Sequence, residues 1–161
     1  MCFILALIMH TISLREINIH DLNLLLEIEL DAANQIHTTH NQPNEEELVT
    51  YLNSIQGFYI DGQIRFVIDV DGIGVGFVDF SDASIDFNSA ATGIIVKKEF
   101  RKKGVGLRAL ELLSVEAKRL NIKRMLAFIL PENKPSIHLF SRAGFVFEEF
   151  VGEFNLYVKV V

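Results

Sequence analysis

Residues 96–107 read Val-Lys-Lys-Glu-Phe-Arg-Lys-Lys-Gly-Val-Gly-Leu, an apolar strand end followed by a basic loop and two glycines. From about Val105 to Leu120 apolar residues recur at helical spacing, so the glycines open a helix. The first amides of a helix have no partner within it, the helix dipole adds positive potential there, and glycine lets the backbone approach an anion. This stretch therefore predicts a phosphate-binding site between a strand and a helix.

The charge distribution supports an anion site. Residues 1–90 carry 2 basic and 14 acidic side chains, whereas residues 91–161 carry 13 basic and 7 acidic ones. A nucleic-acid-binding protein requires a broad basic face, but here the positive charge gathers around Lys97, Lys98, Arg101, Lys102, Lys103 and Arg108. On charge alone, a site for one small polyanion and a solvated helix edge are both open.

Composition restricts the class of protein. The chain has 161 residues, 50% of them apolar, and no Pro, Gly or Ser tract, so we expect residues 1–161 to fold as a single domain. The single cysteine, Cys2, cannot close an intrachain disulfide and fits a reducing cytoplasm. Met1–Met9 is apolar but shorter than the roughly 20 residues of a membrane helix. We interpret residues 1–8 either as an extension of the first strand or as an overlong gene start.

The apolar pattern predicts a mixture of strands and helices. Strands are expected at residues 12–17, 63–70, 74–80, 92–96 and 124–130, and in a hairpin over 145–160. Helices are expected from Asp21 and from Asn44, each acting as an N-cap, and at residues 105–120 and 136–143. Ile36 and Ile55 are assigned to the buried faces of the first two helices. Asp71-Gly72 predicts a tight turn between two antiparallel strands.

Two other phosphate-binding motifs fit the 96–107 stretch poorly. A Walker loop needs Gly-x-x-x-x-Gly-Lys-Ser/Thr, and the final Lys-Ser/Thr pair is missing. A dinucleotide fingerprint is matched formally by Gly104-x-Gly106-x-x-Ala109, but seven residues separate it from the strand. The acidic residue expected about 20 positions later is also absent, because residues 122–124 read Ile-Lys-Arg.

The third interpretation is a family resemblance. Arg101-x-x-Gly104-x-Gly106 resembles the Arg/Gln-x-x-Gly-x-Gly/Ala motif of the GNAT superfamily of N-acetyltransferases, and Gly93-Ile94-Ile95-Val96 resembles its acetyl-CoA strand. The second motif of that superfamily is similar to Asn133-x-x-Ser136-x-x-Leu139-Phe140-x-x-x-Gly144-Phe145. The expected order of elements, β-α-α-β-β-β-α-β-α-β-β, is also the order of that fold. The resemblance implies an α+β fold in three layers, with a mixed, mostly antiparallel twisted sheet flanked by helices.

The resemblance also implies a set of donor contacts. Backbone amides of Lys102, Lys103, Gly104, Val105, Gly106 and Leu107, next to Arg101, would hold the pyrophosphate of acetyl-CoA. Ile94, Ile95 and Val96 would pair their backbone with its pantetheine arm, in a cleft where this strand diverges from the strand at 125–130. Asn133 would touch the same arm, or would only cap the helix that follows Pro131. The implied reaction is direct attack of a primary amine on the thioester, without a metal.

The chain departs from the family pattern at two catalytic positions. The Tyr often proposed to protonate the leaving thiolate is replaced by Phe140, and a Glu often present on the cofactor strand is replaced by Ala91. The remaining candidates for proton transfer are Asp79, Asp82, Asp86 and Ser136, of which Asp79 and Ser136 are taken as the catalytic residues. Within the family, the opening Leu14-Arg15-Glu16 with Asp21 is most similar to the branch of ribosomal-protein, spermidine and amino-sugar acetyltransferases.

The histidines are not assigned to catalysis, and two hypotheses for the function follow from the motifs. His37 and His40 have metal-ligand spacing but are expected at an acceptor rim, and His138 is expected at the surface. The main hypothesis is a cytoplasmic N-acetyltransferase for a small-molecule or peptide amine, with no nucleic-acid or membrane partner. An acyl-CoA-binding regulatory module with little or no catalysis is the alternative. The apolar last strands are expected to allow pairing in a homodimer.

Overall fold

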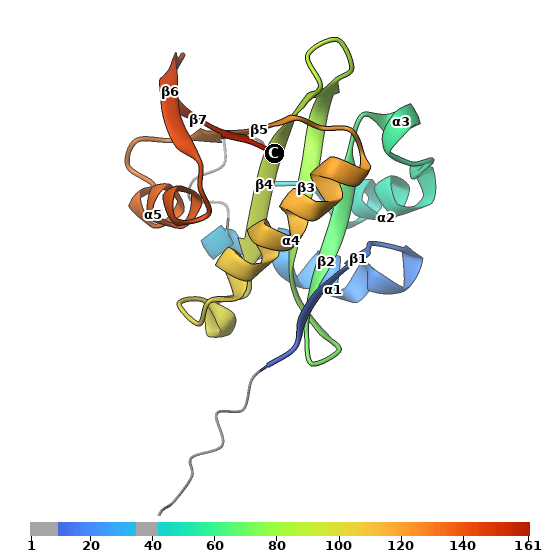
Figure 1. The fold of residues 1–161 in the computed structure, drawn as a ribbon. Coiled ribbons are helices and arrows are strands. Elements are labelled where there is room, and N and C mark those ends of the chain that lie inside the picture. Colours follow the sequence, from blue (N-terminus) through green and yellow to red (C-terminus); the bar gives the residue numbers. More distant parts are fainter. Residues whose placement is uncertain (1–9, 35–41) are drawn as a thin grey trace, which may run out of the picture.

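The computed structural model describes residues 10–34 and 42–161 and contains one seven-stranded sheet, in the order β1-β2-β3-β4-β5-β7-β6 (Figure 1). The strands are β1 (Ile12–Glu16), β2 (Ile64–Val70), β3 (Ile73–Ser84), β4 (Ser89–Val96), β5 (Arg124–Ile129), β6 (Val146–Val151) and β7 (Phe154–Val160). The helices are α1 (Leu22–Glu29), α2 (Glu45–Ser54), α3 (Phe58–Asp61), α4 (Val105–Arg119) and α5 (Lys134–Arg142). All neighbouring strands are antiparallel except β4 and β5, which confirms the mixed, mostly antiparallel sheet.

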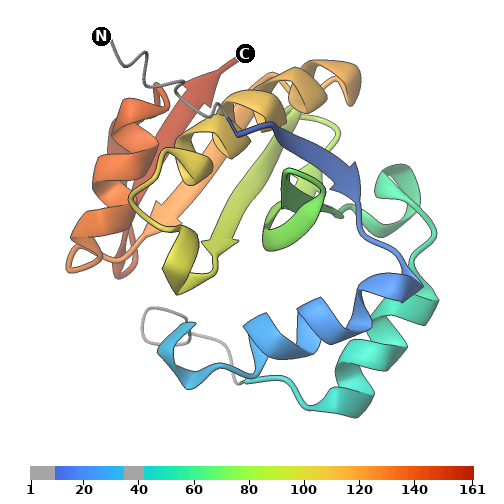
Figure 2. The ribbon, with the colours of Figure 1, turned by 90° about the horizontal axis from the view of Figure 1, so that it is seen from below.

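Helices cover both faces of the sheet. Figure 2 shows α1 and α2 on one face and α4 and α5 on the other. The alternation of side chains along β2 explains why its core is apolar throughout: Val67 packs with α1 and α2, whereas Phe66 and Ile68 pack with α4. Burial on both faces therefore requires a continuous apolar run, which is the pattern that the chain carries here.

The first helix begins and ends differently from the prediction. Asn18, rather than Asp21, provides the capping side chain, and it caps a short 3-10 turn over Ile19–Asp21 that leads into α1. The Asp21 carboxylate instead accepts hydrogen bonds from the Asn18 amide and from both terminal nitrogens of Arg15. Helix α1 ends at Glu29, so the expectation that it continues to Ile36 was wrong at its described end, and Ile36 itself lies outside the described residues.

The turns follow their local chemistry more closely. Asp71 and Gly72 both have positive φ angles, 52° and 82°, as a two-residue hairpin turn requires. Asn44 and Glu47 form the predicted capping box at the start of α2. Ile55 is 41% exposed and does not belong to the buried face of that helix. Helix α3 was not predicted, because it is a single turn, too short for a periodic pattern to show.

The final hairpin turns at Gly152, as predicted, and leaves β6 at the edge of the sheet with all of its residues exposed. Phe140 and Phe145 are buried and meet edge to face, whereas Phe150 is 75% exposed and packs only on the ring of Phe147. Within residues 10–34 and 42–161, no helix is long and apolar enough to cross a membrane.

Candidate active site

The site begins where β4 and β5 part. The two parallel strands pair at only three positions, Ser89, Ala90 and Ala91 against Arg124, Met125 and Leu126. Beyond Ala91, β4 continues to pair with β3 on its other side up to Val96, but no pairing with β5 is present among the described residues. The sheet therefore opens between its two central strands, as the resemblance implied.

Backbone groups of β4 line this opening. The amide of Lys97 donates to the carbonyl of Val75 on β3 at 2.8 Å. In an antiparallel pair, residues that hydrogen-bond to the partner alternate with residues that do not, so Ile95 bonds to β3 whereas Ile94 and Val96 direct their N–H and C=O groups toward the opening. Of the three predicted pantetheine contacts, Ile94 turns both of its backbone groups to the opening. Val96 offers only its N–H there, because its carbonyl accepts a hydrogen bond from Arg101.

The loop after β4 ends at Gly104, which is the N-cap of α4. Gly104 has a φ of 81°, and a Cβ placed there would have no neighbour within 4 Å. A glycine is thus favoured at this position by its left-handed backbone rather than by lack of space. The first bond within α4 runs from the Arg108 amide to the Gly104 carbonyl, at 3.0 Å. The amides of Val105, Gly106 and Leu107 precede it and lie at the positive end of a 15-residue helix.

Gly106 has a different function. A Cβ on Gly106 would lie 3.1 Å from Cδ2 of Leu139 on α5 and 3.7 Å from Cδ1 of Ile94 on β4. Gly106 therefore allows the start of α4 to pack closely between α5 and the open strand. Packing within the protein thus gives Gly106 a reason of its own, whereas the expectation that a ligand approaches the backbone at these glycines stays a prediction.

Two cations of the loop are held by the protein itself. Arg101 donates from Nε to the carbonyl of Val96 at 2.7 Å and from Nη2 to Oδ1 of Asn34 at 2.7 Å. Lys97 forms a 2.7 Å ion pair with Glu27 on α1. These contacts fasten the loop to the region around α1, while Lys102 and Lys103 remain exposed beside Gly104.

The second motif lies on α5. The Asn133 side chain accepts a 3.3 Å hydrogen bond from the amide of Ser136, so Asn133 is an N-cap. Phe140 is 4% exposed, and its ring centroid lies 4.9 Å from that of Phe145. The residue in the place of the family's tyrosine is thus a core side chain without an exchangeable proton.

Asp79 belongs to a charged cluster on the opposite face, beneath α1 and α2. Arg65 on β2 donates to Asp79 Oδ2 at 3.2 Å and to Glu29 Oε1 at 2.7 Å. Its guanidinium carbon lies 5.6 Å from the ring centroids of both Tyr51 and Phe77. Burial opposes the guanidinium charge, but the two carboxylates outweigh it and raise the pKa of Arg65, whereas burial raises the pKa of Tyr51.

Asp79 and Ser136 are not brought into one cluster. Asp79 faces α1 and α2, whereas α5, which carries Ser136, packs on the side of α4. A group lying in the opening would therefore meet Asp79 and Ser136 from opposite sides of the sheet.

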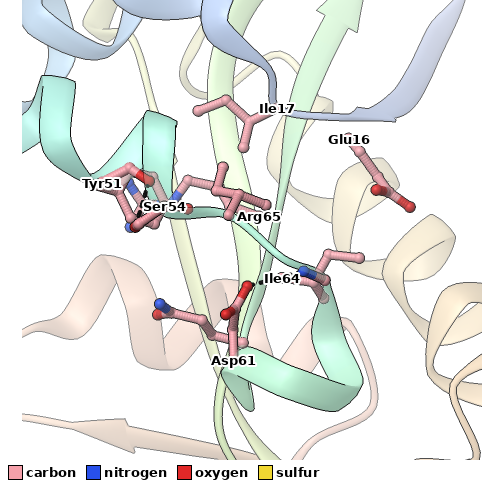
Figure 3. A pocket seen from close by; sticks show the side chains of 10 residues that line it. Glu16, Ile17, Tyr51, Ser54, Asp61, Ile64 and Arg65 are labelled. Atoms are coloured by element: carbon pink, nitrogen blue, oxygen red, sulfur yellow. Dashed lines mark hydrogen bonds between the residues drawn. The ribbon is translucent and has the colours of Figure 1, made fainter.

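Figure 3 shows a small cavity beside the same cluster, between Tyr51, Arg65, Asp61 and Ile17. Its volume is about 50 Å³. Ligand sites usually measure about 300–1,000 Å³, so this cavity has room for a few water molecules and not for a substrate.

Of the three histidines singled out in the sequence, only His138 lies within the described residues. His138 is exposed on α5, as expected. His37 and His40 lie outside the described residues. Among residues 10–34 and 42–161, no group of three His, Cys, Asp or Glu side chains is arranged to hold a metal ion.

The role of Arg65 was missed at the level of the sequence. Arg65 is one of two basic residues in the first 90 and directly precedes the apolar run Phe66–Ile68 of a strand. A buried arginine requires anionic partners, so this pattern could have directed attention to it. The partners themselves come from α1 and β3 and depend on the strand register.

A sheet that opens between parallel neighbours, beside the first amides of a helix, is the arrangement that the resemblance implied for a coenzyme A-dependent acyltransferase. The family model described as "Acetyltransferase (GNAT) domain" matches residues 11–146, and the chain belongs to this family. GNAT enzymes use acetyl-CoA as acyl donor, and solved relatives contain coenzyme A.

The spermidine N(1)-acetyltransferase of Escherichia coli (strain K12) is 26% identical over 149 residues, which are 90% of this chain and 78% of that protein. The spermidine N-acetyltransferase from Vibrio cholerae, solved with CoA and spermine, has a TM-score of 0.79 at 19% identity, covering 91% of this chain and 92% of its own. A ribosomal L7/L12 alpha-N-protein acetyltransferase with coenzyme A has a TM-score of 0.81 at 18% identity and covers 94% of each chain. At these identities the solved structures establish the fold.

Proposed function

We propose that this protein is a cytoplasmic N-acetyltransferase that transfers the acetyl group of acetyl-CoA to a primary amine of a small molecule or peptide. The observation that carries the proposal is the backbone edge of β4, the N–H and C=O of Ile94 and the N–H of Val96, which faces the opening and leads to the first amides of α4. An extended pantetheine arm can pair with the first, and a diphosphate can bind the second.

Donor binding would use mainly backbone groups. The amides from Lys102 to Leu107 hold the pyrophosphate, with Lys102 and Lys103 adding charge. Arg101 contributes by holding the loop against Val96. The amide of Ile94 is placed to donate to the acetyl carbonyl and to stabilise the oxyanion of the tetrahedral intermediate. Asn133 caps α5 through its side-chain oxygen, which leaves its side-chain amide nitrogen as the group for the proposed contact with this arm.

The acceptor side is acidic. An amine arrives as an ammonium ion, and the carboxylate of Asp79, 21% exposed, lies on the face that α1 and α2 cover. Asp79 accepts one proton from the ammonium, directly or through a water molecule, and the free amine attacks the thioester carbon. The C–N bond forms, the C–S bond breaks, and CoA leaves as a thiolate that takes up a proton. The net products are the N-acetyl amine, free CoA and one proton released to solvent.

Protonation of the thiolate cannot come from Phe140. Ser136, half-buried at the start of α5, is the candidate on that side of the opening. A thiol has a pKa near ~8.5, so a thiolate leaves without full protonation in the transition state, and the requirement for an acid is modest.

The missing tyrosine also supports a second candidate function, a CoA-binding regulatory module with weak catalysis. The buried, edge-packed ring of Phe140 is the specific observation that favours it. The two functions differ in turnover, since both predict binding of CoA. Phe140→Tyr would create activity in a regulatory module but change little in an enzyme that already works without the tyrosine.

The test is release of CoA from acetyl-CoA in the presence of spermidine, kanamycin or a peptide with a free amino terminus. Turnover with one of these amines, together with calorimetric binding of CoA, supports the enzyme. Binding without turnover across the panel supports the regulatory module, and absence of binding contradicts both. Gly104→Ala, which alters only the loop, should weaken CoA binding in either case.

We further propose that the protein forms a homodimer through β6. This edge strand is exposed along its length and carries Val146 and Phe150 at 69% and 75% exposure. Light scattering after size exclusion measures the mass, and Phe150→Lys should convert a dimer into a monomer.

A further inference from the structure

The cluster around Arg65 extends across three neighbouring strands of the sheet, β2, β3 and β4. Register places Arg65, Asp79 and Gly93 directly opposite one another on β2, β3 and β4. Their side chains therefore share the face beneath α1 and α2. The row ends at β4, one residue before Ile94, whose backbone faces the opening.

Gly93 makes room for the carboxylate. A Cβ at Gly93 would lie 2.6 Å from Oδ1 of Asp79, closer than two such atoms can approach. Asp79 thus lies across the backbone of β4, and only glycine allows this. Oδ2 is held by Arg65, whereas Oδ1 receives no hydrogen bond from any residue in the described ranges 10–34 and 42–161.

Arg65 is itself fixed from several directions. Tyr51 of α2 and Phe77 of β3 each approach its guanidinium at 5.6 Å, and Glu29 of α1 accepts from Nη1 at 2.7 Å. A guanidinium that is stacked on aromatic rings and bonded to two carboxylates has little freedom to turn. Its Nε–H consequently defines where Oδ2 of Asp79 can lie.

The cluster also joins three elements of the fold. Arg65 of β2 is shared between two carboxylates, Glu29 of α1 and Asp79 of β3. The family position on β4 that often carries an acidic residue holds Ala91, which lies on the same face as Gly93, two residues away. A carboxylate reaches this part of β4 from the neighbouring strand instead.

We propose that Arg65 is a positioning residue: it holds the Asp79 carboxylate over Gly93, with Oδ1 directed to the acceptor amine. This inference rests on the proposed function, because it assigns Asp79 to the amine of the acetyl-transfer reaction. Arg65 touches no reacting atom and acts only through Asp79.

The test compares Asp79→Asn, Arg65→Met and the double variant, using whichever of spermidine, kanamycin or the peptide amine the wild-type protein acetylates fastest. Loss of a positioned base commonly costs about 100-fold or more in rate. We expect kcat to fall about 100-fold in Asp79→Asn and at least about 10-fold in Arg65→Met, with unchanged affinity for CoA. If Arg65 acts through Asp79, the double variant is no slower than Asp79→Asn alone.

Three further variants keep the result interpretable if Arg65→Met folds poorly. Arg65→Lys retains the charge but not the double hydrogen bond, and should restore part of the activity. Gly93→Ala leaves both charged residues present but displaces Oδ1, and should lower kcat while CoA still binds. Arg119→Met is the matched control, since Arg119 also pairs with two carboxylates, Glu16 and Glu116, but at the surface, and its removal should leave kcat unchanged.

The split between kcat and KM adds a readout that a purely structural role would not change. Removal of the guanidinium in Arg65→Met should lower kcat, while the KM for acetyl-CoA stays unchanged. Multiplicative effects of Arg65→Met and Asp79→Asn, or a Gly93→Ala protein with wild-type kcat, would overturn the inference. If the wild-type protein binds CoA but acetylates none of the three amines, the proposed function fails instead.

Discussion

Asp21→Asn tests the ionic cluster that joins β1 to the start of α1. The Asp21 carboxylate is 8% exposed and accepts hydrogen bonds from Arg15 Nη1 at 2.9 Å, Arg15 Nη2 at 2.7 Å and the Asn18 amide at 2.9 Å. Arg15 also donates to Asp69, which is 7% exposed. An asparagine keeps one acceptor oxygen but removes the charge and turns an amide donor toward the guanidinium.

The expected loss lies between two limits. Exposed ion pairs contribute about 0–1 kcal/mol, and removing one partner of a fully buried pair costs about 3–5 kcal/mol. Because the Arg15 side chain is 42% exposed, solvent screens part of the effect. We expect Asp21→Asn to lower the free energy of unfolding by about 2 kcal/mol, which for a chain of this size lowers Tm by about 4–8 °C.

The stabilisation by Asp21 should depend on pH in a defined direction. The hydrogen bonds from Arg15 hold the pKa of Asp21 below its usual value, against the opposing effect of burial. The stabilisation is therefore fully present above the pKa of the unfolded chain, about 3.9, and is lost as pH falls through the lower pKa of the folded state. The Tm difference between wild type and Asp21→Asn should be constant from pH 5 to 7 and should close below about pH 4.

Thermal melting and urea unfolding at a series of pH values measure this directly. Glu148→Gln is the matched control, because Glu148 forms a 2.8 Å pair with Arg124 in which both side chains are more than 40% exposed. Its effect should stay within about 1 kcal/mol. A Tm for Asp21→Asn within 1 °C of wild type, or a difference that does not become smaller as pH falls from 5 to 3, would refute the reasoning.

Two glycine substitutions complete the set. Gly104→Ala places a side chain at a φ of 81°, so it should cost about 1–2 kcal/mol in unfolding free energy and weaken CoA about 10-fold, as melting and calorimetry would show. Gly76→Ala brings a Cβ to 2.3 Å from the backbone carbonyl oxygen of Ile95, which cannot move without breaking the sheet. It should cost more than about 3 kcal/mol, and a soluble protein with wild-type Tm would contradict this.

The parts of the fold that local chemistry determines could be predicted from the sequence. The turn at Asp71-Gly72, the capping box of Asn44 and the glycine-opened helix each depend on residues adjacent in the chain. The cap of α1 was misassigned because Asp21 has the chemistry of a cap but is engaged by Arg15, a contact that requires β1 to be placed first.

The acceptor side could be predicted only in part, for a related reason. Asp79 was a candidate from its chemistry, but its partner Arg65 lies on β2 and is brought opposite it only by the strand register. Arg65 is in turn held by Glu29 of α1. The donor side was more accessible, since its groups are backbone amides whose positions follow from a short motif. Side chains that meet across the sheet leave no comparable local signature.

Because β4 and β5 pair at only three positions, the sheet consists of two plates, β1-β2-β3-β4 and β5-β7-β6, with little hydrogen bonding between them. The chain connects these plates through α4, whose residues Ala109, Leu110 and Leu113 are fully buried against them. The angle between the plates, and with it the width available to a thioester, is therefore determined by how closely this helix packs. Shortening the Leu110 side chain should therefore change the width of the opening between β4 and β5 from within the hydrophobic core.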